Sequence, residues 1–482
     1  MRLLRGVYEG PGSHGILRVA TSMRGVHAVL RGLPGEGYFP ALYAARERIG
    51  EAAPVTLSPL RENPGGTWAP GGDLSRDLSS VVRRHPETEA VIIARSETAL
   101  LSGEEAPETS LPESGETGRA PKLVTCEWES LGVGETEAAD LALVDLVRAH
   151  VRGRRERSPS PTVNLFGPPV FGPGAAAEYA EAERLLDLIG VGVNVRVPLG
   201  ASVGDLGRLP RAWANVLLYR EVGESATLYL QDELGMQRAT TPMVGAAGTG
   251  AALRTVGELC HLNPKKVQQA VWAELARTAK LPWYARLHRP ETFRDRRVAI
   301  FGDFTYPLGL GYALAREVGL EVAACGTYLG HLERDFLFHA HTFTDEAFVE
   351  DDPEEVAARI EAVEPDLVVG THLEEDIADA LDVPFLSLCP PAAHSPFVGR
   401  PLMGYTGSSV LADALDAALT RPDEEPQEDL EAAGMPWTDE ALDELAQIPP
   451  FLRGRSRRLA EERARKLGAV AVSRQIFLES RL

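Results

Sequence analysis

This chain has few residues of the types that bind metals or carry out catalysis, and their spacing in the sequence does not form a complete metal or catalytic site. Four cysteines stand far apart and form no CxxC pair: Cys126, Cys260, Cys325 and Cys389. A zinc ribbon or an iron–sulfur site made by this chain alone is therefore not expected, and each cysteine is expected to be a small buried side chain. His339 and His341 would project from the same side of a strand, as a metal pair could, but no third ligand is obvious, and two histidines in a connecting loop are the alternative.

Small residues follow three expected strands, at Gly10-Pro11-Gly12, Gly167-Pro168-Pro169 and Gly302-Asp303. Parallel sheets bind ligands at such strand ends, although a tight turn without a ligand explains the same residues. The chain has no Walker lysine motif, so ATP binding by this chain is not supported. It also has no GxSxG or HExxH motif. Local motifs therefore indicate an α/β ligand-binding protein and no particular reaction.

The elements that would position these residues follow a βαβ pattern, in which apolar runs alternate with amphipathic stretches. A helix is expected at residues 17–30. An extended segment is expected at residues 3–8, and strands are expected at residues 90–95, 122–126, 162–166, 191–198, 215–219, 297–301, 321–325, 367–370 and 385–388. The predicted fold class is α/β, with three Rossmann-like domains built on parallel sheets and a small helical C-terminal domain.

Proline, glycine and charge runs set the expected domain boundaries. The first α/β domain spans residues 1–153 and carries an insert at 102–121 that is rich in Glu, Ser, Thr, Gly and Pro. The remaining parts are a second α/β domain, a third α/β domain, an acidic linker and a C-terminal helical domain, at residues 162–282, 290–419, 420–436 and 437–482. Residues 453–466 hold seven basic and two acidic residues, which indicates either a solvated helical face or a contact with an acidic partner.

The composition excludes several classes of protein. With 49 basic and 70 acidic residues the net charge is −21, which argues against a nucleic-acid binder and against docking on an anionic membrane. No run of about 18 apolar residues occurs, so no membrane span is expected. The N-terminus lacks the apolar stretch of a secretion signal, and a cytoplasmic location is expected.

Longer motifs resemble one known family from one end of the chain to the other. They begin with YEGPGSHGILRVATSMRGVHAVLRG at residues 8–32 and GEGYFPAL at 35–42. They continue as VNLFGPP, PWYAR, RRVAIFGD and EPDLVVGT, and they end with IPPFLRGRSRRLAEERARKLGAVAVS at residues 448–473. In this order the motifs resemble the B subunit of light-independent protochlorophyllide oxidoreductase, a family related to the nitrogenase molybdenum–iron proteins.

The resemblance implies an assembly and a reaction. Two B subunits would pair with two N subunits as an N2B2 heterotetramer, and a separate ATP-hydrolysing iron–sulfur protein would supply electrons. A [4Fe-4S] cluster would take three cysteines from N and one carboxylate from B. Electrons would then reach a tetrapyrrole substrate, protochlorophyllide, whose ring D double bond is reduced in chlorophyll or bacteriochlorophyll biosynthesis. The missing Walker motif and the scattered cysteines agree with this division of labour.

The carboxylate ligand falls on Glu36, by the register of GEGYF, where the family has aspartate. Glutamate is also a hard oxygen donor but is one methylene longer. Ser96 stands where the family usually carries a cysteine. Serine has a hydroxyl in place of the soft thiolate of cysteine. This substitution weakens any role of this position beside the cluster.

The substrate pocket departs further from the family. The family's proton-donating aspartate aligns with Arg289, whose guanidinium cannot supply a proton at useful rates. The adjacent His288 titrates in a useful range and is the alternative donor, whereas Arg289 could pair with a propionate of the substrate. The family's pocket histidine aligns with Ala393, so that His394, one place away, is the expected substrate contact. Gly404 is the second expected substrate contact.

Two functional hypotheses follow from these residues. The first is a B-type subunit of the reductase, an oxidoreductase that contributes Glu36 to a shared cluster. The second is a diverged paralogue that keeps the fold and the assembly but acts on another tetrapyrrole or serves as a scaffold without catalysis. The substitutions at Glu36, Ser96, Arg289 and Ala393 leave both open at this stage.

Overall fold

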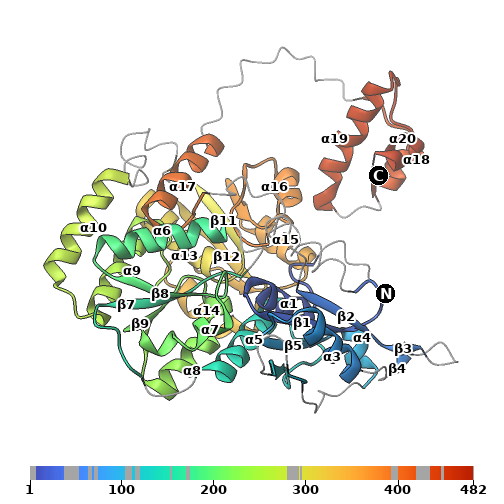
Figure 1. Cartoon of the computed structure of the whole chain (residues 1–482). Coiled ribbons are helices and arrows are strands. Elements are labelled where there is room, and N and C mark those ends of the chain that lie inside the picture. Colours follow the sequence, from blue (N-terminus) through green and yellow to red (C-terminus); the bar gives the residue numbers. More distant parts are fainter. Residues whose placement is uncertain are drawn as a thin grey trace. The chain divides into compact units, whose positions relative to one another are not determined.

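The computed structural model describes most of the chain (Figure 1). The described residues are 7–36, 54–62, 68–69, 74–103, 111–113, 120–151, 155–169, 174–278, 293, 296–391, 400–419, 435–446 and 450–480. They group into two compact units. One comprises residues 9–279 and 397–408, and the other comprises residues 1–8, 280–396 and 409–482.

The first sheet has four parallel strands in the order β2-β1-β5-β6. These strands are β2 (Val55–Pro59), β1 (Val26–Gly32), β5 (Ala90–Arg95) and β6 (Lys122–Thr125). Both central strands, β1 and β5, are buried along their whole length. Helix α3 (Leu74–Arg84) packs Leu78, Val81 and Val82 against Val29, Val91 and Ile93 of the sheet. A short antiparallel pair, β3 (Arg61–Glu62) and β4 (Trp68–Ala69), follows β2.

Helix α1 (Gly12–Ser22) packs closely on α5 (Glu135–His150) in the same unit. The close approach depends on Gly15, since a Cβ atom there would lie 1.9 Å from the carbonyl oxygen of Glu135. A short helix, α4 (Glu97–Leu101), follows β5 directly. One α/β layer thus contains the carboxyl ends of β1 and β5. It also contains the beginnings of α1 and α4.

The second sheet also has four parallel strands, in the order β10-β9-β7-β8. They are β10 (Gln237–Ala239), β9 (Ala214–Leu217), β7 (Thr162–Phe166) and β8 (Gly192–Val197). The helices of this region are α6 (Ala175–Leu188), α7 (Val203–Leu206), α8 (Glu224–Leu234), α9 (Gly245–Leu259) and α10 (Pro264–Thr278). Two single 3-10 turns, Leu209–Arg211 and Arg220–Val222, flank β9.

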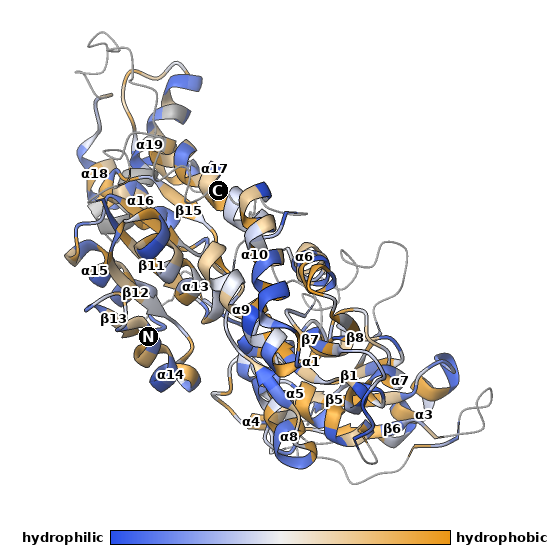
Figure 2. Cartoon of the chain, turned by 90° about the vertical axis from the view of Figure 1, so that its left-hand side faces the viewer, coloured by the Kyte–Doolittle hydropathy of each residue, from blue (hydrophilic) through white to orange (hydrophobic). Residues whose placement is uncertain are grey.

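The third sheet lies in the other unit and has five parallel strands in the order β13-β12-β11-β14-β15. They are β13 (Ala347–Val349), β12 (Glu321–Thr327), β11 (Arg297–Gly302), β14 (Leu367–Gly370) and β15 (Phe385–Ser387). The connecting helices are α13 (Thr305–Ala313), α14 (Glu333–Ala340), α15 (Pro353–Ala362) and α16 (Glu375–Leu381). Helix α13 continues into a π-helical turn at Leu314–Val318. Helix α17 (Gly404–Leu419) comes later in the chain. Helices such as α3 and α10 carry both hydrophilic and hydrophobic residues, as helices on the faces of a sheet do (Figure 2).

Three helices make the C-terminal part: α18 (Asp439–Ala446), α19 (Pro450–Lys466) and α20 (Arg474–Glu479). They surround a small core of Ala441, Leu445, Ala460, Ala464, Val472 and Phe477. Several arginines here pair with acids of the same part: Arg463 with Glu479, and Arg474 with Glu444. Some of the local positive charge is therefore balanced within these helices.

The three parallel sheets confirm the predicted α/β class, and each lies within the span of one predicted α/β domain. The predicted helix at residues 17–30 is wrong in its second half, where β1 begins at Val26 after a turn at Gly25 with φ of 76°. A strand that is buried on both faces has the same apolar run as a buried helix, and the interior of the sheet decides in favour of the strand. The predicted domain boundaries stay predictions.

The strand considered for His339 and His341 is not present, and the alternative of a connecting loop holds only for His341. His339 lies in α14, and His341 follows the last residue of that helix. Residues two apart on a helix point about 200° apart, so the two imidazoles do not share a side as they would on a strand. Among the described residues no group of three His, Cys, Asp or Glu side chains could hold a metal ion.

Candidate functional site

Glu36 lies at the carboxyl end of β1, in the turn that leaves the strand. The Glu36 N–H donates to the Leu33 carbonyl oxygen over 3.2 Å, and Gly35 takes a φ of 106°. This turn folds the side chain back toward the strand, where its Oε2 accepts the Leu33 N–H. Its Oε1 accepts a hydrogen bond of 2.7 Å from the Thr98 hydroxyl. The carboxylate is therefore half-buried, and each of its oxygens is oriented by one donor.

Gly32 and Ser96 complete the surroundings of this carboxylate. A Cβ atom at Gly32 would lie 2.3 Å from Glu36 Oε2 and 2.8 Å from Ser96 Oγ, so that only glycine leaves room for the folded side chain. Ser96 is buried and caps α4 by accepting the Ala99 N–H over 3.2 Å. The structure thus brings together Glu36 and Ser96, which the sequence singled out separately. Thr98 was not singled out, because no local pattern indicates a contact across 62 positions.

A pocket lies at the same edge of the first sheet, lined among others by Gly12, Ser13, Arg95, Glu97 and Trp128. Arg95 is buried there, and its Nε donates to Glu129 Oε2 over 2.8 Å. Burial raises the pKa of Glu129, while hydrogen bonds from Arg95 oppose that rise.

His14, on the first turn of α1, is close enough to Glu36 and Glu97 to feel their charges. Burial lowers the pKa of His14, although the neighbouring glutamates Glu135, Glu97 and Glu36 work against this effect. The imidazole is therefore neutral at pH 7, and it adds no positive charge beside the Glu36 carboxylate.

All four cysteines are buried, as expected, and none of them forms a disulfide. Burial raises the pKa of the Cys260 thiol to about 11, and it also raises the pKa of Cys126 and Cys325. Thiols with raised pKa values stay protonated at neutral pH in the absence of a metal.

These donors fit one ligand of an iron–sulfur cluster rather than a full set. Glu36 offers a carboxylate whose two oxygens each accept one hydrogen bond and retain further lone pairs. Among the described residues no three His, Cys, Asp or Glu side chains come together to supply the remaining ligands of such a cluster.

The expected substrate residues are only partly described. Arg289, His288, His394 and Ala393 lie outside the described residues. Gly404 is described and is the first residue of α17, with a φ of 75°. A Cβ atom at Gly404 would lie 2.4 Å from the Glu181 side chain, so the immediate neighbour of this glycine is a carboxylate of α6.

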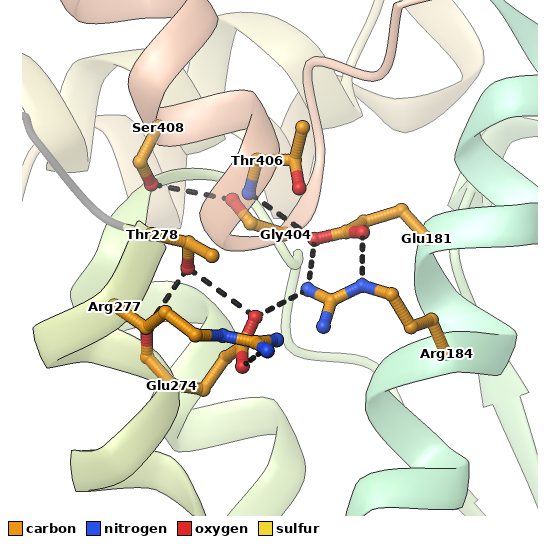
Figure 3. A network of polar contacts seen from close by, with 8 residues as sticks. All are labelled: Glu181, Arg184, Glu274, Arg277, Thr278, Gly404, Thr406 and Ser408. Atoms are coloured by element: carbon orange, nitrogen blue, oxygen red, sulfur yellow. Dashed lines mark hydrogen bonds and ion pairs between the residues drawn. The ribbon is translucent and has the colours of Figure 1, made fainter.

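Two carboxylates from α6 hold the beginning of α17, and Figure 3 shows one of them, Glu181. Glu178, which is buried, accepts the backbone N–H groups of Leu402 and Met403 over 2.7 and 2.9 Å. Glu181 accepts the Thr406 N–H over 3.1 Å. Helix N-termini leave such N–H groups without partners inside the helix, so the two glutamates stabilise this end.

Arg184 connects this carboxylate pair to α10. Its Nε donates to Glu181 over 2.8 Å, and its second nitrogen lies 2.7 Å from Glu274, which also pairs with Arg277 (Figure 3). Burial alone would raise the pKa of Glu181, but Arg184 and the Thr406 N–H lower it overall. The charged network is thus a built feature of this unit that the sequence did not predict, since it joins three helices far apart in the chain.

The turn after β11 holds no space for a ligand at Gly302. A Cβ atom there would lie 2.4 Å from the Cβ of Cys389, and the Asp303 carboxylate accepts the Tyr306 N–H over 3.3 Å. Nearby, the buried Glu374 accepts hydrogen bonds of 2.7 Å from the Tyr8 hydroxyl and from Thr371. Of the two interpretations for Gly302-Asp303, the geometry favours the tight turn.

Comparisons with known proteins agree with this fold. Residues 12–420 match the family model described as nitrogenase component 1 type oxidoreductase, and residues 437–481 match the model described as proto-chlorophyllide reductase 57 kD subunit. A solved structure titled nitrogenase Cp1 at pH 6.5 shares the fold, with a TM-score of 0.68 at 14% identity over 87% of this chain and 94% of that chain. Within the described residues no helix is long and apolar enough to cross a membrane.

Full-length relatives carry one common name. The B subunit of the light-independent protochlorophyllide reductase from Chlorobium limicola is 31% identical over 100% of this chain and 99% of its own length. Its counterpart from Chlorokybus atmophyticus is 27% identical over 97% and 96%. The chain therefore belongs to the nitrogenase component 1 type oxidoreductase family, together with the B subunits of light-independent protochlorophyllide reductases.

Proposed function

We propose that this chain is the B-type subunit of an ATP-dependent, light-independent reductase that reduces the ring D double bond of protochlorophyllide. Its full-length relatives bear the name of this subunit, and the match covers both the α/β part and the C-terminal helices. In this proposal two copies assemble with two N-type subunits, and a separate ATP-hydrolysing iron–sulfur protein delivers the electrons. When bound between the subunits, a [4Fe-4S] cluster supplies one-electron transfer.

The observation that carries the proposal is the oriented carboxylate of Glu36. It follows a fully buried strand, and hydrogen bonds from Leu33 and Thr98 fix both oxygens. A hard oxygen donor in a rigid, half-buried position is what one chain must offer to a cluster whose thiolates come from its partner. Glu36 is thus the proposed ligand, and the extra methylene relative to aspartate is taken up by folding the side chain back over Gly32.

The substrate side of the proposal concerns three residues outside the described part, together with Gly404. His288 is the proposed proton donor in place of the family's aspartate, and Arg289 the proposed partner of a propionate. His394 and Gly404 are the proposed contacts with the macrocycle. The α6 glutamates support Gly404 in this role, because they hold the beginning of α17 in place.

Iron content and turnover of the assembled complex test this function. The chain would be purified without oxygen together with its N-type subunit, and iron would be measured in wild type and in the Glu36→Ala variant. Turnover of protochlorophyllide would then be followed in the dark with dithionite, ATP and the donor protein. The proposal expects cluster iron that depends on Glu36 and a reduced product. An iron-free complex or the absence of product would reject it.

A titration of the complex with protochlorophyllide separates a diverged paralogue from the reductase. A stable complex that contains iron but shows no absorbance change with pigment would indicate a diverged chain that keeps the assembly without this substrate.

A further inference from the structure

We propose that Thr98 is a positioning residue whose hydroxyl orients Glu36 and thereby raises the reduction potential of a cluster bound there. The inference rests on the proposed function, since it takes Glu36 as the cluster ligand from this chain. It concerns a residue that the sequence analysis did not single out and that touches the carboxylate from a different element.

The two oxygens of Glu36 are held by donors of different kinds. Oε2 accepts the Leu33 N–H, which belongs to the same turn and follows any movement of that turn. Oε1 accepts the Thr98 hydroxyl over 2.7 Å, from a helix 62 positions later in the chain. The bond from Thr98 therefore ties the turn that carries Glu36 to the end of β5, whereas the bond from Leu33 only shapes the turn itself.

Thr98 is itself fixed by its surroundings. It lies in the first turn of α4, whose cap Ser96 accepts the Ala99 N–H over 3.2 Å. Immediately before this cap, Arg95 donates its backbone N–H and its Nε to Glu129, each over 2.8 Å. A donor on such a braced element loses little freedom when it forms a hydrogen bond, so it constrains its acceptor effectively.

A glutamate in place of aspartate makes this constraint more important. The longer side chain has one more rotatable bond, and Gly32 leaves the space into which it folds. Without the Thr98 hydroxyl, Oε1 would lose its described donor from outside the turn. Thr98 thus compensates for the freedom that the additional methylene introduces.

The same hydrogen bond has an electronic effect. A hydroxyl that donates to a ligating carboxylate withdraws electron density from it, and hydrogen bonds to cluster ligands favour the reduced state. Removal of the donor leaves a more basic oxygen, which favours the oxidised state. The midpoint potential is therefore expected to fall when Thr98 loses its hydroxyl.

The test compares Thr98→Val, which keeps the shape, with Thr98→Ser, which keeps the hydroxyl, in the complex with the N-type subunit. The midpoint potential would be measured by redox titration followed by electron paramagnetic resonance, and iron release to a chelator would be timed. Thr98→Val is expected to lower the potential and to accelerate iron release about tenfold, the lower end of the usual effect of a residue that supports a ligand. Thr98→Ser is expected to resemble wild type.

Thr342→Val is the matched control, because it also removes a threonine hydroxyl that donates hydrogen bonds, here to Tyr312 and His339. It lies in the other unit and should change neither readout.

Should Thr98→Val fail to assemble, Thr98→Ala serves in its place. In a Glu36→Asp background the effect of Thr98→Val should shrink, since the shorter side chain no longer reaches the same donor.

The outcomes separate the inference from the function on which it rests. Wild-type complex without iron, or iron that is retained in Glu36→Ala, overturns the proposed function and the inference together. Iron that depends on Glu36, combined with a Thr98→Val complex of wild-type potential and wild-type iron release, overturns the inference alone.

Discussion

At the scale of single residues, Gly32 decides whether the candidate ligand can take its position. The glycine lies under the folded Glu36 side chain, and a Cβ atom would approach Oε2 to 2.3 Å. Both oxygens of the carboxylate already have donors, so it has no equally good place to go.

Gly32→Ala is therefore expected to displace Glu36 and to lower the iron content of the complex, with a stability loss of about 1–3 kcal/mol from the crowding. Iron analysis and thermal unfolding measure the two effects. The control is Gly330→Ala, because a Cβ atom there meets nothing within 4 Å. Full iron occupancy in Gly32→Ala would show that the carboxylate is not needed in this position.

Predictions at this site from the sequence are limited to residues whose partners lie close by in the chain. Glu36 was found because the GEGYF motif carries its register along the chain. Thr98 was missed because its contact with Glu36 depends on the pairing of β1 with β5, which no local spacing encodes. Predictions for Arg289, His288 and His394 stay predictions, since these residues lie outside the described part.

At the scale of elements, the strands that were predicted best are the ones buried on both faces. β5, β7 and β14 begin and end where the apolar runs do. The wrong prediction of a helix over the second half of residues 17–30 also comes from burial on both faces. An apolar run in the middle of a sheet carries no periodicity that distinguishes it from a buried helix. The network of α6, α10 and α17 could not be predicted, since it pairs groups more than 200 positions apart.

The α6 carboxylates give a prediction about the beginning of α17. Glu178→Gln replaces one accepting oxygen with an NH2 group that faces a backbone N–H, so one donor in a buried place loses its partner. A loss of about 1–3 kcal/mol in the free energy of unfolding is expected. Denaturant unfolding measures it, with Glu183→Gln on the same helix as the control. Glu183 is far more exposed, and equal losses in both variants would contradict the assigned role of Glu178.

A second prediction at this scale concerns pH. Asp140 of α5 accepts the Ser225 N–H at the start of α8, and burial raises its pKa from 3.8 to about 7. The folded state thus binds a proton more tightly than the unfolded state, so the stability from Asp140 is present below pH 4 and is lost as the pH rises through 7. The loss is on the order of a few kcal/mol at most.

Asp140→Asn cannot titrate, so the slope of stability against pH between 4 and 8 should become flatter than in wild type. Unfolding in denaturant across this range measures it. Asp232→Asn, which changes an exposed aspartate of α8, should leave the slope unchanged. A wild-type slope in Asp140→Asn would mean that other groups carry the pH dependence.

At the scale of the whole molecule, the scattered cysteines agree with the proposal that the thiolate ligands of the cluster come from a partner subunit. Cys126 follows β6 and Cys260 ends α9 in one unit, while Cys325 lies within β12 and Cys389 follows β15 in the other. Each is buried, and no three metal-binding side chains come together among the described residues. In the proposed function, the contribution of this chain to the cluster is thus the half-buried carboxylate of Glu36.

The last prediction follows from this arrangement. Chain purified alone under anaerobic conditions, and then supplied with iron and sulfide, should hold no stable cluster, whereas the complex with the N-type subunit should hold one for each copy of this chain. Single replacements Cys126→Ala and Cys260→Ala should keep the iron of the complex, because neither cysteine belongs to a group of three metal-binding side chains among the described residues, and Glu36→Ala should lose it. Iron and sulfide analysis with an electron paramagnetic resonance spectrum measures each case. A cluster in the isolated chain, or one that disappears with a buried cysteine, would mean that the ligands come from this chain after all.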